Sequence, residues 1–287
     1  GSTTLHQFVR SQRSHKVKPG IPDIASPDGL LVSDSFQKAT ILNKQFTSVA
    51  VPDDPRLVIP PLQYDTRLTR QFTRVHITTA DVRKAISNLK SGKEPGLDGI
   101  TNNMIKKLAP AISFPLSRLF NLSFTTGKFP TDWKLAKIVP IYKCKGSKSQ
   151  ASNYRPISLL SCISKLCERL FFNQLYNHIS PALDPAQSGF RRGDSTALQL
   201  TKLIQNIADH RHMGRKVAMC FFDLEKAFDT VWHRALLAKL SKVFGVCDSA
   251  LEWITDYLSD RTQVVFVGGT LSDASPVLSG VPQGSIL

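Results

Sequence analysis

The stretch that decides the fold is Val217-Ala-Met-Cys-Phe-Phe-Asp223-Leu-Glu-Lys-Ala-Phe228-Asp229-Thr-Val-Trp-His233. It begins with apolar residues that show no helical spacing, and this pattern predicts a buried β-strand over residues 217–222. Asp223 then lies at the carboxyl end of that strand, where sheets commonly present functional side chains. A helix is predicted soon afterwards, because apolar residues recur on one face until Gly245.

Two interpretations of Asp223 follow from its position. The residue can cap the helix that follows, which the spacing alone favours, or its carboxylate can bind Mg²⁺, which prefers oxygen ligands. The string F-x-D-L-x-K-A-F-D-T-V-x-H favours the second interpretation. It resembles the first palm motif of the reverse transcriptases of non-LTR (LINE-type) retrotransposons. Four further stretches occur in the order of that family and extend the resemblance over about residues 80–287.

The composition indicates a polyanionic partner. Lys and Arg total 37 against 22 Asp and Glu, so the net charge is +15 and the pI about 9.8. Nucleic acid is the first candidate, because the chain has neither a basic amphipathic helix nor a long apolar run that would favour a membrane. The 5 cysteines have no zinc-site spacing and are expected to be free thiols of a reducing compartment.

The two ends of the chain and its first segment give little evidence of function. The chain opens on Gly1-Ser2 without an initiator methionine and stops within the expected start of a helix, so both ends are expected to be cut. The first twenty residues carry basic side chains and no acid, which suits either a basic arm on nucleic acid or a solvated tail. Residues 1–75 are therefore interpreted as a basic arm and linker.

Residues 90–100, K-S-G-K-E-P-G-L-D-G-I, form a glycine- and proline-rich loop after a helix that Thr78 is predicted to cap. As a connector this loop would be unremarkable. However, it is similar to the motif that precedes the fingers in the same family, and Lys93 is then expected to contact a nucleic-acid backbone.

Two neighbouring stretches carry the expected fingers motifs. W-K-x-A-x-I-x-P-I-x-K begins at Trp133 and N-Y-R-P-I-S-L begins at Asn153, and both read as strands. The stretch from 133 to 148 contains five lysines and no acid, so it is either a solvated hairpin or a platform for phosphates. The resemblance implies that Lys143 and Arg155 bind the incoming triphosphate, while Lys134 and Lys137 are expected to contact the template.

Two further patterns lie on either side of the expected palm strand. Q-x-G-F-R-x-G-x-S-T resembles another family motif, in which Phe190, Arg191 and Arg192 would contact single-stranded template; Phe190 is equally well explained as a core anchor. The acids from Asp248 to Asp260 recur every four residues, which is typical of a solvated helix face rather than a metal site.

The chain ends with G-V-P-Q-G-S, which is similar to the second palm motif of the family and places Gln283 beside the incoming nucleotide. The resemblance implies catalysis by two Mg²⁺ (or Mn²⁺) ions, with Asp223 as the catalytic carboxylate and the Leu224 carbonyl as a second ligand. Phe228 would exclude a ribose 2′-hydroxyl. The family also uses a later Asp-Asp pair, but the chain's own pair, Asp53-Asp54, lies far upstream. Only about half of the metal site is therefore expected in this chain.

The predicted fold class is α+β, with the fingers and a partial palm of a right-hand, reverse transcriptase-like polymerase. Residues 76–215 are expected to form the fingers and connecting helices, and residues 216–287 an incomplete palm. The implied function is RNA-directed DNA synthesis from deoxynucleoside triphosphates on an RNA template with a DNA primer, with this chain inactive as it stands. The alternative is a non-catalytic RNA- or DNA-binding module. The full-length protein is also expected to carry an upstream endonuclease domain and to be intracellular, as a ribonucleoprotein of the nucleus and cytoplasm. No membrane partner is predicted.

Overall fold

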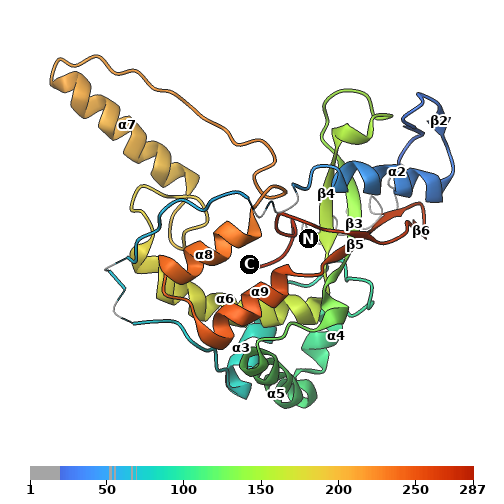
Figure 1. The fold of residues 1–287 in the computed structure, drawn as a ribbon, viewed down its shortest axis with the longest axis horizontal. Helices are drawn as coiled ribbons and strands as arrows, with labels where there is room; N and C mark the ends of the chain where they lie inside the picture. The colour runs from blue at the N-terminus through green and yellow to red at the C-terminus, as the bar shows by residue number, and fades with distance from the viewer. Residues whose placement is uncertain (1–19, 52–53, 55, 66, 69) are drawn as a thin grey trace, which may run out of the picture.

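The computed structural model describes residues 20–51, 54, 56–65, 67–68 and 70–287 (Figure 1). Helices and strands are mixed along the chain, which agrees with the α+β class. Among the described residues the helices are α2 (Ser35–Thr47), α3 (Thr79–Ser87), α4 (Asn102–Lys107), α5 (Ala109–Thr126), α6 (Cys162–Ile179), α7 (Thr196–His212), α8 (His233–Lys242) and α9 (Asp248–Leu258). The strands are β1 (Ile24–Ala25), β2 (Leu31–Val32), β3 (Leu135–Tyr142), β4 (Tyr154–Leu159), β5 (Thr262–Val267), β6 (Thr270–Leu271) and β7 (Ser275–Pro276).

The main sheet brings together strands that are far apart in sequence. Its order is β4-β3-β5-β6, and β7 also pairs with β5. β3 and β4 form an antiparallel hairpin with Ile138 opposite Ser158, whereas β5 runs parallel to β3 with Val264 opposite Lys137. β7 pairs antiparallel with β5, with Gln263 opposite Ser275.

Helices α3, α5, α6 and α9, with part of α8, enclose an apolar core beside the sheet (Figure 1). Trp253 of α9 stacks on Phe171 of α6, with ring centroids 4.2 Å apart. The predicted capping box of Thr78 and Asp81 is confirmed at the start of α3. Gly127 ends α5 with a φ of 63°, a left-handed conformation that glycine adopts without strain.

Helix α5 is covered on one face only. Its sequence is apolar nearly all round, but Phe114 and Leu122 are exposed while Phe120 and Phe124 are buried. The helix packs against α3 and α9, so only the face toward these helices is covered. Composition alone could not reveal which face that is.

Part of the segment interpreted as a linker belongs to the folded structure. From residue 20 onward it forms β1, β2 and α2, and α2 lies along the main sheet (Figure 1). Ile24 and Leu42 have no exposed surface and share a second core with Ile138 and Val265. The basic arm itself, residues 1–19, lies outside the described residues.

The predicted strand over residues 217–222 is wrong. These residues form no strand in the structure, and Phe221 and Phe222 are 79% and 90% exposed. β5 has β3 along one edge and β6 and β7 along the other, so it offers no free edge. An apolar strand needs a hydrogen-bonding neighbour, and no described strand supplies one.

Helix α7 extends away from the rest of the molecule, and the segment that follows it returns alongside (Figure 1). Ser195 caps this helix, its side chain accepting a hydrogen bond from Leu198 N, but none of the helix residues is buried. Among the residues that the structure describes, no helix combines the length and apolarity needed to cross a membrane.

Candidate nucleotide and nucleic-acid site

Loop 279–286 lies where segments distant in sequence meet. Val281 N donates to Phe228 O at 2.8 Å, and Gly280 N donates to Val231 O at 3.0 Å. Gly280 has a φ of 79°, and a Cβ at this position would lie 2.6 Å from Phe228 O. Only glycine therefore allows the loop to approach residues 228–231 this closely.

Gln283 is held in the same place from two sides. Its side-chain Nε2 donates to Asp229 Oδ1 at 2.7 Å, and its carbonyl oxygen accepts from Ser158 N of β4 at 2.9 Å. A Cβ on the next residue, Gly284, would lie 2.6 Å from Ser158 O. The loop thus joins the segment after Asp223 to the β3–β4 hairpin, so residues from three of the predicted motifs come together.

Asp223 lies in the exposed segment that precedes this junction. Its side chain and that of Leu224 are exposed. Asp229, by contrast, is half-buried, and its backbone oxygen accepts from Ser279 Oγ at 3.0 Å. Within the described residues, no group of three or more His, Cys, Asp or Glu side chains could hold a metal ion.

Phe228 and Phe190 come from different predicted motifs and contact each other. Their rings meet edge to face, with centroids 6.1 Å apart. Phe228 is 48% exposed and Phe190 is more exposed still, with a positive φ of 62°. Neither ring is a core anchor in this structure, so both can present aromatic surface to a ligand.

The predicted phosphate-binding residues lie on the β3–β4 hairpin. Arg155 is exposed on β4 opposite Ile141 of β3, and Lys143 is exposed just beyond β3, where its Nζ donates to Ser152 O at 2.7 Å. Lys137 is half-buried and holds its ammonium group 4.0 Å from the centroid of the Phe266 ring.

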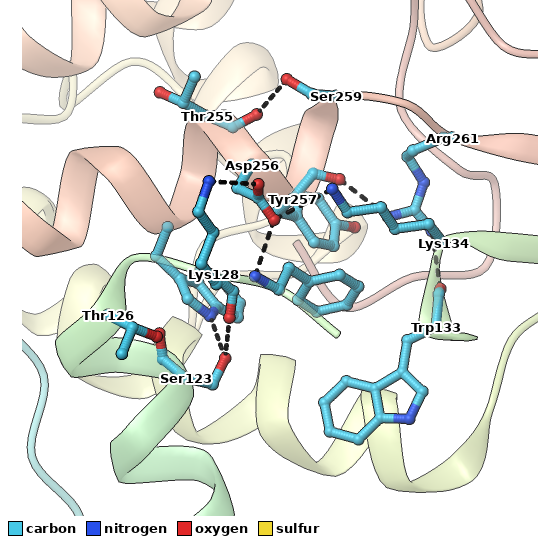
Figure 2. A network of polar contacts seen from close by, with 12 residues as sticks. Ser123, Thr126, Lys128, Trp133, Lys134, Thr255, Asp256, Tyr257, Ser259 and Arg261 are labelled. Carbon is cyan, nitrogen blue, oxygen red and sulfur yellow. Dashed lines mark hydrogen bonds and ion pairs between the residues drawn. The ribbon is translucent and has the colours of Figure 1, made fainter. Parts of the chain in front are cut away.

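Lys134 cannot serve as the predicted template contact. Its side chain is 8% exposed, and its Nζ lies 3.0 Å from Asp256 Oδ2 (Figure 2). A buried ammonium group needs such a partner, because desolvation of an unpaired charge is costly. Lys134 lies just before β3, at the end of the short helical turn Thr131–Trp133, and its place among the other lysines of the sequence did not reveal that its side chain is buried.

Asp256 is correspondingly not part of a solvated acidic face. Its carboxylate also accepts from Phe129 N at 2.8 Å and pairs with Lys128 at 3.3 Å, as Figure 2 shows. Burial tends to raise the pKa of this carboxyl group, but the hydrogen bonds from Phe129 N–H and Lys134 outweigh burial and hold the pKa below its usual value. Of the acids in the stripe, Asp248, Glu252 and Asp260 are exposed as predicted.

Arg191 and Arg192 are held against neighbouring groups. Arg191 Nη1 donates to Asp184 O at 2.9 Å, and Arg192 Nη2 donates to Asn173 Oδ1 at 2.6 Å. The Arg192 guanidinium group also lies 4.6 Å from the centroid of the Tyr176 ring. Both side chains are therefore oriented before any nucleic acid binds.

Lys93 is exposed in the loop of residues 90–100, which is packed against the start of α6. A Cβ on Gly96 would lie 2.8 Å from Ser161 N, so this glycine is needed for the contact. The loop therefore has a defined position next to the β4–α6 junction, but no described contact joins Lys93 to loop 279–286.

Three polar residues of the junction escaped the sequence analysis. Ser279 links Val51 N, at 3.0 Å, to the Asp229 carbonyl, and Glu168 is buried in α6 beside the end of loop 279–286. Arg261 is buried and donates to Tyr257 O at 2.9 Å. Only Glu168 carried a signal, as an acid among the apolar residues of α6.

Comparison with known proteins gives the family. The family described as "Reverse transcriptase (RNA-dependent DNA polymerase)" matches residues 145–287. The chain is 35% identical over 213 residues to the "Probable RNA-directed DNA polymerase from transposon BS" and 33% identical over 213 residues to the "RNA-directed DNA polymerase from mobile element jockey", both of Drosophila melanogaster. It is 27% identical over 293 residues to the jockey polymerase of Drosophila funebris.

These alignments cover 74% of this chain for the two Drosophila melanogaster relatives and 100% for the Drosophila funebris relative. The chain spans 23% of the length of the first two relatives and 32% of the third. The family match over residues 145–287 includes Asp223 and Gln283. The chain therefore belongs to the reverse transcriptase family of the non-LTR retrotransposons.

Proposed function

We propose that the protein containing this chain is an RNA-directed DNA polymerase that extends a DNA primer on an RNA template. One observation carries the proposal: Gln283 Nε2 and Asp229 Oδ1 lie 2.7 Å apart although the residues are 54 positions apart in sequence. The contact unites two stretches that resemble the palm motifs of this family. It orients a side-chain amide beside the segment that carries Asp223.

The remaining site residues have roles that suit their chemistry and position. Arg155 and Lys143 are exposed cations on one hairpin, suited to the phosphates of an incoming nucleotide. Phe228 is proposed to contact the sugar, which its exposed ring supports. The residues proposed to contact template or primer share exposed or half-buried positions outside the apolar cores; they are Lys93, Lys137, Phe190, Arg191 and Arg192.

Reverse transcriptases generally use divalent metal ions, and the Asp223 carboxylate with the Leu224 carbonyl is the proposed contribution of this chain to Mg²⁺ or Mn²⁺ binding. The described residues do not complete a site for two ions, because they contain no group of three suitable side chains. The same proposal holds that the full-length protein has an upstream endonuclease domain and acts within a ribonucleoprotein of the nucleus and cytoplasm.

The two aspartates test the proposal in the full-length protein. Asp223→Asn should abolish primer extension on an RNA template with Mg²⁺ or Mn²⁺. Asp229→Asn should be milder, because its amide oxygen can still accept the hydrogen bond from Gln283. Near-wild-type extension by both variants would overturn the assignment of Asp223.

The second candidate function is nucleic-acid binding without chemistry. The net charge of +15 supports binding, and the lack of a metal-binding group among the described residues supports inactivity. Residues 1–287 by themselves are expected to bind nucleic acid without extending a primer. Asp223-dependent extension by residues 1–287 would exclude this candidate and show that the chain supplies the missing ligands itself.

A further inference from the structure

We propose that Glu168 is a positioning residue of the nucleotide site, which acts by anchoring loop 279–286 to helix α6. The inference rests on the proposed polymerase function, because it assigns Glu168 to the loop that carries Gln283. Glu168 lies in the middle of α6, far from the helix ends at Cys162 and Ile179, so it is no helix cap. Its role must therefore come from the groups around its carboxyl group.

The carboxyl group is fully buried and has a partner for each oxygen. Glu168 is 0% exposed. Oε1 accepts from Ser164 Oγ at 2.8 Å, and Oε2 accepts from the backbone N–H of Ile286 at 2.8 Å. Ser164 is also buried and lies one helical turn earlier, so it fixes the orientation of the carboxyl group.

A buried acid at this position lowers the stability of the fold unless specific interactions compensate for its lost hydration. Within the described part of the chain, no Lys or Arg side chain forms an ion pair with Glu168. Its neighbours in α6, Leu166, Cys167 and Leu170, belong to the apolar core. A buried carboxyl group without a cation is costly, and an apolar side chain of similar size would pack there at lower cost. The specific gain that the acid offers is the hydrogen bond to Ile286 N–H.

That hydrogen bond completes the attachment of the loop. Gly280 and Val281 are bonded to residues 228–231 on one side of Gln283, and Ser158 holds the Gln283 carbonyl. On the other side, a turn in which Ser285 N donates to Pro282 O leads to Ile286. Glu168 therefore fixes the far end of the loop, and Gln283 lies between two fixed ends.

Three variants of the full-length protein test the anchor. Glu168→Ala removes both hydrogen bonds. Glu168→Gln keeps an oxygen for Ile286 N–H and an amide that can donate to Ser164 Oγ, so it should rescue the function. Leu170→Ala is the matched control, because Leu170 is buried on the same helix and its apolar side chain cannot form a hydrogen bond to the loop.

The first measurement is hydrogen–deuterium exchange, which needs no activity. Glu168→Ala should speed exchange of the Ile286 amide by at least about 10-fold, while exchange in α5 and α9 stays close to wild type. Leu170→Ala should lower the unfolding temperature without selectively exposing residues 279–286. Exchange at Ile286 that is unchanged in Glu168→Ala would overturn the proposal, even if the protein proves not to be a polymerase.

The second measurement is steady-state primer extension. Misplacement of Gln283 should raise the KM for deoxynucleoside triphosphate in Glu168→Ala by roughly 10-fold, within the 10²-fold that a shift of about 1 Å can cause. The Kd for primer–template should stay unchanged, and Glu168→Gln should remain within about threefold of wild type. If Glu168→Ala does not fold, Ser164→Ala replaces it and should show a smaller change in the same direction. Equal KM values for Leu170→Ala and the anchor variant would show a merely structural role and overturn the proposal.

Discussion

Asp256 illustrates how a single carboxylate can connect three parts of a chain. It accepts from Phe129 N and pairs with Lys128 and the buried Lys134. Asp256→Asn should lower the free energy of unfolding by about 2–3 kcal/mol, because it leaves the Lys134 ammonium buried without a charge partner. Urea denaturation would measure this change. Glu252→Gln, on the exposed face of the same helix, should change stability by less than about 0.5 kcal/mol; comparable losses in both variants would contradict the assignment.

The lowered pKa of Asp256 predicts a dependence of stability on pH. Since the pKa of Asp256 is lower in the folded chain, the contribution of Asp256 to the free energy of unfolding is fully present above the pKa of the unfolded carboxyl group, about 3.9. It is lost as the pH falls through the folded pKa. Between about pH 6 and about pH 3, Asp256→Asn should therefore lose less stability than the wild type. Denaturation curves at both values test this, and parallel losses in the two proteins would show that Asp256 does not contribute.

Phe228 is proposed to exclude the ribose 2′-hydroxyl. Its ring is half exposed and meets Phe190 edge to face, so replacement should not create a core cavity. Phe228→Val should raise ribonucleotide incorporation relative to deoxynucleotide incorporation by more than it lowers overall kcat/KM. Phe228→Tyr keeps the ring and should keep the selectivity. A loss of stability in Phe228→Val without a change in sugar preference would instead indicate a packing role.

At the scale of elements, helix α2 is part of the folded sheet layer rather than a linker. Leu42 is fully buried against β3 and β5, and Asn43 donates to Ser272 Oγ at 3.1 Å and to Asp273 O at 2.9 Å. Leu42→Ala should cost about 3 kcal/mol of unfolding free energy, through lost burial and the cavity that remains. Lys44 is exposed on the same helix, so Lys44→Ala should change the free energy of unfolding by less than about 0.5 kcal/mol. Equal and small effects would mean that α2 does not support the sheet in solution.

At the scale of the whole molecule, the charge surplus predicts salt-sensitive binding of nucleic acid. The logarithm of the affinity should fall with the logarithm of salt concentration, with a slope of roughly −0.9 per duplex phosphate neutralised and roughly −0.7 for single strands. The double variant Lys143→Ala and Lys145→Ala, at the tip of the β3–β4 hairpin, should make the slope shallower by about 1 for each lysine. Lys44→Ala on α2 is the control. Binding that is absent or insensitive to salt would contradict the nucleic-acid role.

The sequence by itself determined the features that depend on local chemistry. Caps at Thr78 and Ser195 start helices, and Gly127 ends α5, because these interactions involve neighbouring residues only. The β5 strand follows from its run of β-branched residues. The family could also be identified from the sequence, because its motifs are short strings in a fixed order. The comparisons with known proteins confirm this family.

Only the tertiary structure decided what depends on partners from elsewhere in the chain. Residues 217–222 have the composition of a strand but pair with no described strand, so they form no regular secondary structure and are exposed. Lys134 looked like its lysine neighbours in the sequence, yet its side chain is buried and pairs with Asp256, 122 positions later. Glu168 lies in a core helix beside Ile286, a contact between residues separated by 118 positions. Edge pairing, burial and ion pairing over such separations are set by packing, and no local pattern encodes them.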